Sequence, residues 1–421
     1  MLKYKLFITN LVLTLFFGEL GASEEFKFRG DFFLSSSLTS VKNKQPLNSG
    51  NRSLEIPQQI FIGEVRPDLK WDFAENHFFV LRSSHDYRLG NTELTLPTEE
   101  KSISKGKTDL TDLFFTSDWT ETFSTVIGLQ SYQWGPGEFY SPTNPFFHFQ
   151  SEQKKFFFKE KGRVLARANW NVSDQLIAVF ISEFMDNREE PWMTESDFEQ
   201  KTAVKIDYQF FNPIHSIAFL YGKGDQNLSF FGAHGTYSPA EGISVYVDAK
   251  FTQGRKAFFP KKNIFGLYDL EKSDDTSIYT TSLVGFRFED NFDFRQEFLS
   301  YDAGYTDEEW KNAKRSASSL SLNLPKNVSR FYKPGLEFKR KNYSYTSLRI
   351  PNLGPKDSMT ISFRVLASLS ENSQLPQLAY EHNLTDAMVG TVEYSRSMGN
   401  EDTELNLLTD DQISAGIRYA F

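Results

Sequence analysis

The sequence predicts an all-β fold, an antiparallel up-and-down β-barrel that crosses a membrane. Apolar and polar residues alternate with a period of two in about eighteen segments, as in strands with one face in lipid and one in water. Short connections and long ones follow these segments in turn. After the first 23 residues, no apolar run approaches the roughly 18 residues that a membrane-spanning helix needs.

The last strand of the chain shows the alternation most clearly. Ile413, Ala415, Ile417, Tyr419 and Phe421 share one face, and small or polar residues occupy the other. This ending resembles the closing strand of bacterial outer-membrane β-barrels, in which the barrel-assembly machinery reads a terminal aromatic residue after alternating apolar residues. The resemblance implies that Tyr419 and Phe421 form an assembly signal and that the protein lies in the bacterial outer membrane.

The first 23 residues have the features of a secretory signal peptide. Lys3 and Lys5 precede an apolar stretch over 6–17, and small residues follow up to Ser23. The apolar stretch is too short to span a bilayer. Residues 24–421 are then expected to form a single transmembrane barrel domain.

An even number of strands closes a barrel without leaving an open edge. We expect eighteen strands, with sixteen as the alternative. The candidate strands lie near 25–40, 58–73, 77–88, 109–119, 122–134, 162–171, 174–184, 201–211, 214–224, 227–237, 241–253, 276–289, 291–304, 339–351, 357–370, 372–384, 386–397 and 412–421.

The connections favour a barrel over a soluble β-sandwich. Those after even-numbered strands are short, and most of those after odd-numbered strands are long. Such two-sided asymmetry is typical of outer-membrane barrels with both termini on the periplasmic side. The loop 305–338 is expected to hold a short helix, because the acidic residues from Asp307 suit a helix N-terminus. The long connections cover 41–57, 89–108, 135–161, 185–200, 254–275, 305–338 and 398–411.

Three tryptophans occupy equivalent places in the predicted strands. Trp71, Trp119 and Trp170 each fall at the end of an even-numbered strand, just before a short turn. We expect them to form a girdle at the periplasmic membrane interface, where an amphipathic ring is favoured. The alternative is that all three are buried core residues.

The composition excludes several classes of site. The chain has no cysteine, which excludes disulfides, a lipid-modified cysteine anchor, thiolate metal sites and a cysteine nucleophile. A net charge of −9 without a basic tract argues against nucleic acid as a partner. The six histidines are scattered without metal-ligand spacing. We therefore expect no catalytic residue, no metal and no cofactor.

Charged residues of both signs occupy the strand face opposite the apolar one. A barrel of 16–18 strands is wide enough for an aqueous channel, which fits such a face. Alternatively, these charges pair across the lumen and close it together with inward-folded loops. Arg163, Arg167 and Lys205, on neighbouring strands, indicate handling of an anion or carboxylate. The residues expected to line the pore or bind a ligand are Tyr132, Trp134, Arg163, Arg167, Lys205, Asp207, Arg295, Glu297, Arg364 and Arg418.

The third long loop is rich in proline, glycine and aromatic residues, which set fixed turns and need protein surface to pack on. It resembles, in its ordinal position, the third extracellular loop of porins, which bends into the lumen. The resemblance implies a constriction, and the alternative is an outward aromatic flap. The expected constriction residues are Glu138, Phe146, Phe147, His148 and Phe149, and the expected packing core is Tyr132, Trp134, Phe146, Phe147 and Phe149.

The segment that begins Trp134-Gly135-Pro136-Gly137 is also similar to one in the capsule-assembly family of outer-membrane barrels, which hold surface polysaccharide. The similarity covers about a dozen residues. Two functions follow. The first is a porin-like channel that passes small hydrophilic solutes by diffusion. The alternative is a non-conducting barrel that binds surface polysaccharide or a cell-surface partner.

The resemblances also imply partners. Outer-membrane lipid and lipopolysaccharide, the barrel-assembly machinery, and a small hydrophilic solute or saccharide are expected to contact the protein. Either a monomer or a homotrimer is expected.

Overall fold

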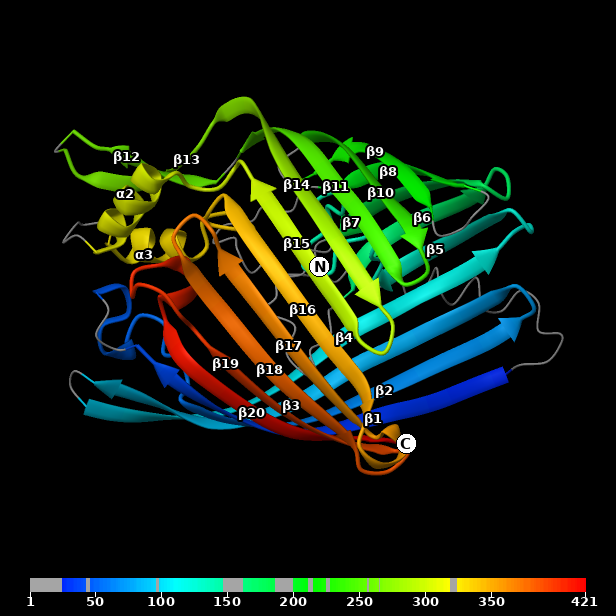
Figure 1. Cartoon of the computed structure of the whole chain (residues 1–421), viewed down its shortest axis with the longest axis horizontal. Coiled ribbons are helices and arrows are strands. Elements are labelled where there is room, and N and C mark those ends of the chain that lie inside the picture. Colours follow the sequence, from blue (N-terminus) through cyan, green and yellow to red (C-terminus); the bar gives the residue numbers. More distant parts are fainter. Residues whose placement is uncertain are drawn as a thin grey trace, which may run out of the picture.

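Eighteen antiparallel strands form one sheet that closes on itself (Figure 1). The computed structural model describes residues 25–42, 46–95, 98–146, 162–185, 200–210, 215–224, 228–255, 257–264, 266–318 and 324–421. The predicted signal peptide lies outside these residues. The first strand, β1 (Glu25–Val41), pairs with both β2 (Gln59–Ala74) and β20 (Thr409–Ala420), which closes the ring. The count of eighteen is confirmed, and the alternative of sixteen is wrong.

Every predicted strand coincides with a strand of the barrel, in the predicted order. Between β2 and β20 the barrel strands are β3 (His77–Thr95), β4 (Thr98–Asp118), β5 (Phe123–Gln130), β6 (Arg163–Asn171), β7 (Leu176–Met185), β8 (Thr202–Gln209), β9 (Ser216–Lys223), β10 (Ser229–Ala240), β11 (Ile243–Arg255), β14 (Asp275–Glu289), β15 (Asp293–Tyr301), β16 (Asn342–Leu353), β17 (Met359–Ser368), β18 (Ser373–Asn383) and β19 (Met388–Arg396).

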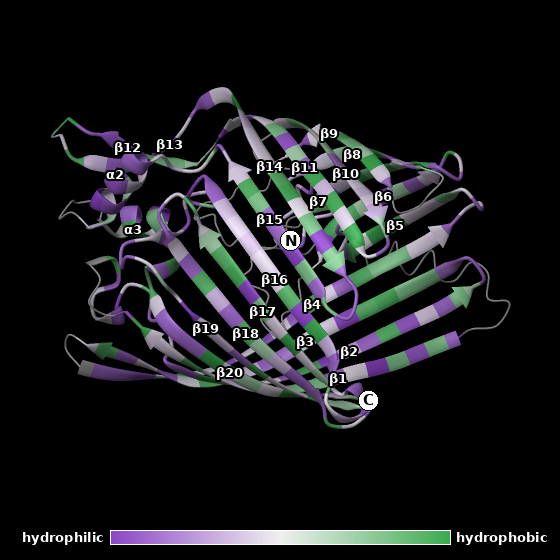
Figure 2. Cartoon of the chain, viewed as in Figure 1, coloured by the Kyte–Doolittle hydropathy of each residue, from purple (hydrophilic) through white to green (hydrophobic). Residues whose placement is uncertain are grey.

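Large apolar side chains cover the outer face of the barrel. Phe28, Leu34 and Phe298 are 59%, 52% and 54% exposed. Apolar and polar bands alternate along the strands in Figure 2. Such a surface is unfavourable in water and suits the hydrocarbon of a bilayer. None of the helices in the described part of the chain is long and apolar enough to cross a membrane.

The two ends of the barrel differ. We call the end with the β2–β3 and β4–β5 connections the turn end, and the opposite one the loop end. The prediction of a long loop at 89–108 is wrong, because β3 and β4 continue as a paired ribbon up to Thr95 and Thr98. Charged and hydroxyl residues dominate this stretch, so it lacks the apolar face by which the other strands were recognised.

Two helices and a hairpin gather at the loop end (Figure 1). They are α2 (Asp307–Ser318), α3 (Leu324–Tyr332), and the pair β12 (Phe258–Lys262) and β13 (Tyr268–Lys272). The predicted helix start at Asp307 is confirmed. Thr306 and Glu309 cap it reciprocally, because each backbone N–H donates to the other's side chain, at 2.8 and 3.2 Å. The hairpin and α3 were not predicted.

The predicted tryptophans lie at the turn end. Trp119 and Trp170 are 61% and 54% exposed, so the buried-core alternative is wrong for both. Trp71 packs against Phe73 with ring centroids 5.5 Å apart. A membrane–water interface favours exposed indole rings, so their position at the turn end agrees with the predicted girdle.

Candidate functional site

The connection after β5 crosses the interior of the barrel. The backbone N–H groups of Glu138 and Phe139 donate to the carboxylate of Glu297 at 2.6 and 2.8 Å. Glu297 belongs to β15, which lies eight strands from β5 in a ring of eighteen. The connection therefore reaches almost the opposite wall. We call residues 131–146 the arch.

A second buried carboxylate holds the arch further along. Asp248, on the inner face of β11, accepts hydrogen bonds from the Ser141 hydroxyl at 2.7 Å and the Thr143 N–H at 3.0 Å. The Thr143 hydroxyl also lies 3.0 Å from Nδ1 of His234 on β10. Asp248 and Glu297 are both 0% exposed. Because a buried carboxylate needs donors, the arch and these two strands stabilise one another.

The side chain of Glu138 reaches the same wall. Its carboxylate lies 3.1 Å from Nε of Arg295 and accepts a hydrogen bond from the Tyr345 hydroxyl at 3.1 Å. The Tyr246 hydroxyl donates to Glu297 at 2.6 Å, beside the arch backbone. Three of the predicted site residues, Glu138, Arg295 and Glu297, are therefore brought together where the arch meets β15.

An apolar cluster packs the near half of the arch against β6–β10. Trp134 is 8% exposed and Phe146 is 0% exposed, with their rings 5.8 Å apart. Tyr132 packs against Trp134 at 5.3 Å. These three belong to the predicted packing core. Phe147, His148 and Phe149 lie outside the described residues.

A second cluster packs the far half of the arch, and the sequence did not point to it. Phe139 and Tyr140 are each 1% exposed. Phe139 stacks on Tyr345 at 5.4 Å, and Tyr140 meets Phe338 edge-on at 5.1 Å. Burial and a neighbouring carboxylate, Glu337, raise the pKa of Tyr140 well above its ordinary value. The described part of the loop thus contacts the barrel interior, as the predicted constriction requires and the outward flap does not.

The three predicted cations on β6 and β8 each have their own partner. Arg163 is 3% exposed and forms an ion pair with Glu183 at 2.9 Å. Lys205 pairs with Asp207 at 2.6 Å and lies over the ring of Trp134. Arg167 lies 3.9 Å from the ring centroid of Tyr132. Their charges are thus compensated by carboxylates or aromatic faces rather than pooled at one point.

The remaining two predicted cations differ from each other. Arg364 lies 3.6 Å from Glu393, so its charge is offset within the wall. Arg418 is exposed, and no described acidic group lies within ion-pair distance of it. Nearby on β2, Glu64, Arg66 and Asp68 have side chains that are 13%, 13% and 17% exposed, so solvent reaches charged groups on this inner face.

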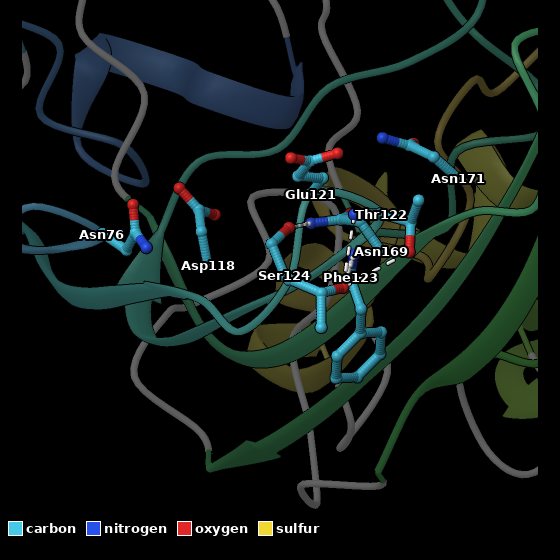
Figure 3. Close-up of a pocket in the computed structure, with 9 residues that line it drawn as sticks. Asn76, Asp118, Glu121, Thr122, Phe123, Ser124, Asn169 and Asn171 are labelled. Atoms are coloured by element: carbon cyan, nitrogen blue, oxygen red, sulfur yellow. Dashed lines mark hydrogen bonds between the residues drawn. The ribbon is translucent and has the colours of Figure 1, made fainter.

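A polar pocket of about 580 Å³ lies at the turn end. Figure 3 shows Asp118 and Glu121 on its rim and the Asn169 amide bonded to Ser124, at 3.0 Å. The pocket is lined by the turn ends of β4–β6 and by the short connections beside them, and no residue of the arch lines it. Among the described residues, no group of three or more histidine and acidic side chains could hold a metal ion.

No protein-family model and no curated protein matches the sequence. The chain is similar to the structure of Acinetobacter baumannii OccAB1, with a TM-score of 0.56 and 7% identity over 94% of this chain and 96% of that one. It is also similar to a BenF-like porin from Pseudomonas fluorescens Pf-5, with a TM-score of 0.53 and 9% identity over 96% and 100%. A third similar structure is Pseudomonas aeruginosa OccK5, with a TM-score of 0.52 and 8% identity over 94% and 98%.

At these identities the likeness shows a shared fold. The predicted resemblance to porins is therefore confirmed for the architecture. The similarity of the segment from Trp134 to the capsule-assembly family stays a prediction.

Proposed function

We propose that the protein is an outer-membrane channel that passes small hydrophilic solutes by diffusion. The observation that carries this proposal is a closed barrel with an apolar exterior and charged inner residues that solvent reaches, such as Arg418, which has no described ion-pair partner. Unpaired charge in a dry interior is costly, so an inner face of this kind favours water. The similar structure from Pseudomonas fluorescens is itself described as a porin.

The arch is proposed to narrow this channel. Two buried carboxylates, Asp248 and Glu297, fix its backbone across the bore, and apolar clusters pack both halves. A segment held at so many points stays in place while solutes pass. The predicted constriction residues, Phe147, His148 and Phe149 included, belong to this proposal, and the predicted pore-lining residues stay a prediction.

The cellular setting is proposed from both ends of the sequence. Residues 1–23 direct secretion, and Tyr419 and Phe421 are read by the barrel-assembly machinery. The loop end then faces the cell exterior, in contact with lipopolysaccharide, and both termini face the periplasm. The protein is either a monomer or a homotrimer, and crosslinking in the membrane would distinguish the two.

Solute flux into proteoliposomes tests the proposed function. Liposomes that contain the folded protein are expected to swell in small sugars or amino acids, at rates that fall as the solute grows. Protein kept in its heat-denatured form is the control for leakage. Swelling no faster than in that control would contradict the channel.

The alternative function, binding of a surface polysaccharide, rests on the similarity of the segment from Trp134 to the capsule-assembly family. Helices α2 and α3 and the β12–β13 hairpin add folded surface at the loop end. Retention of labelled capsular glycan by a barrel that gives no solute flux would support this function instead.

A further inference from the structure

Among the described residues, burial is uneven around the circumference of the barrel. Every barrel strand from β5 to β19 has at least two buried residues, whereas β2 and β20 have none. β1 has two, Gly30, which the Phe421 ring covers, and Phe33, which is 4% exposed. We call the inner faces of β20, β1 and β2 the open wall.

The filled part of the bore is explained by the two apolar clusters that hold the arch. One cluster joins Trp134 and Phe146 to residues of β6–β10, such as Leu165. The other joins Phe139 and Tyr140 to β11, β14–β17, the β12–β13 hairpin and the helices at the loop end, and it includes Leu47, Leu405 and Leu407 from the connections β1–β2 and β19–β20. Neither cluster contains a residue of β20, β1 or β2. In the sheet, β1 lies between β20 and β2.

The side chains of the open wall are small where the two end strands meet. Ser35 lies opposite Gly416, and Ser37 lies opposite Ser414, in the register of β1 and β20. All four are partly exposed on the inner face. Serine and glycine side chains project little from the wall, and the serine hydroxyls can form hydrogen bonds to a passing solute.

Most charges on the open wall are already paired. Arg66 binds Glu64 through two hydrogen bonds, at 2.6 and 2.9 Å, and Arg29 binds Asp68 at 2.8 Å. Such internal pairs present little net charge to a solute.

Asp31 and Arg418 differ from the other charges of this wall. Neither has a described ion-pair partner within 4.0 Å. They share the inner face near the turn end, because Asp31 lies opposite Ala420 on β20 and Arg66 on β2, and Arg418 lies opposite Phe33 on β1. An unpaired charge in a narrow aqueous path acts on permeating ions more strongly than a compensated one.

We infer that solutes pass off-centre, along the open wall, and that Asp31 and Arg418 set the charge preference of this path. The inference rests on the proposed channel function and specifies its route. The arch and the clusters around it then act as packing that pushes the path to one side of the bore.

Cysteine accessibility tests the route, because the natural chain has no cysteine and offers no background reaction. Ser35→Cys and Ser414→Cys introduce near-isosteric thiols on the open wall. Thr281→Cys on β14 and Ser347→Cys on β16 are matched controls from the filled wall, where these residues are 4% and 7% exposed. A charged methanethiosulfonate reagent is applied to single channels in planar bilayers.

The reagent is expected to reduce the conductance of the two open-wall variants by roughly half and to leave the two controls unchanged. Equal block on both walls, or block confined to the controls, would overturn the off-centre route while the channel itself stands. If the unmodified, folded protein shows no conductance, the channel fails and the route fails with it.

Reversal potentials in a salt gradient test the charged pair. Arg418→Gln is expected to shift selectivity toward cations, and Asp31→Asn toward anions, because each variant removes one charge that has no described ion-pair partner. Arg287→Gln, on β14, removes a charge that is paired with Asp293 at 2.9 Å and is expected to give a smaller shift. A shift in Arg287→Gln as large as that in Arg418→Gln would overturn the assignment.

Discussion

The ring of Phe421 lies directly over Gly30, where the last strand meets the first. The two residues exchange both backbone hydrogen bonds, each 2.9 Å long. A Cβ atom built on Gly30 would stand 2.6 Å from Cζ of Phe421. The Phe421 ring therefore occupies the space that the side chain of any residue other than glycine would take at position 30, at the seam that closes the barrel.

Gly30→Ala is expected to destabilise the seam by about 1–3 kcal/mol, because the added methyl group displaces the Phe421 ring. The expected readout is a lower temperature for the heat-induced gel shift of the folded barrel. Gly63→Ala is the control, since the nearest atom to its Cβ is a Leu34 methyl group at 3.7 Å. Equal stability of the two variants would show that the ring has no fixed position.

Phe421→Ala is expected to reduce the amount of barrel that inserts in the membrane and to leave protein in the periplasm. Fractionation of cells followed by the heat-shift gel measures both pools. Phe363→Ala removes another outward aromatic, 40% exposed, away from the terminus and is expected to insert normally. Equal insertion of both variants would contradict the assembly signal.

Glu297→Ala is expected to release the far end of the arch. The variant leaves the N–H groups of Glu138 and Phe139 without their acceptor, at about 1–3 kcal/mol for each buried donor. Single-channel recordings should show larger and noisier conductance steps. Glu289→Ala, at an exposed site that is ion-paired with Arg287, serves as the control. If the conductance steps of both variants have the same size and the same low noise, Glu297 is not an anchor of the arch.

The loop end is expected to respond to pH through Glu371, between β17 and β18. Burial, followed by the charge of Glu404, raises the pKa of Glu371 to about 7, against opposing contributions from the Glu404 N–H, Arg340 and Lys314. A raised pKa in the folded state means that folding favours the protonated form. The contribution of Glu371 to the stability of the folded state is therefore fully present below about pH 4.5, and it is lost as pH rises through 7.

Hydrogen exchange of the backbone N–H of Glu404, which donates to Glu371 at 2.5 Å, measures this effect. Protection, corrected for the intrinsic exchange rate, should fall between pH 5 and 8 by about tenfold or less. In Glu371→Gln the dependence in this window should disappear. A dependence that persists in the variant would assign it to another group.

The sequence predicted the barrel strands well because lipid and water impose a two-residue period on each of them. In the ribbon that runs on from Leu89 and Ser104, charged and hydroxyl residues dominate both strands, so the period carries little apolar signal and 89–108 was taken for a loop. The β12–β13 hairpin escaped prediction because its five-residue strands pack on α2 at the loop end rather than on lipid.

The candidate site was predictable only in part. The aromatic content of the third loop pointed to Trp134 and Phe146. It did not show that Phe139 would reach Tyr345, because that contact joins residues about 200 positions apart across the bore. Nor does periodicity say which inward charges pair. Arg163 and Arg418 have the same pattern in the sequence, yet only Arg163 lies beside a carboxylate, Glu183.

Planar-bilayer recording of the purified, folded protein tests the central claim most directly. A hydrated bore beside the arch predicts discrete, stable conductance steps, and deletion of residues 138–149 should enlarge them. A folded barrel that inserts and carries no current, with or without the arch, would contradict a channel in this protein.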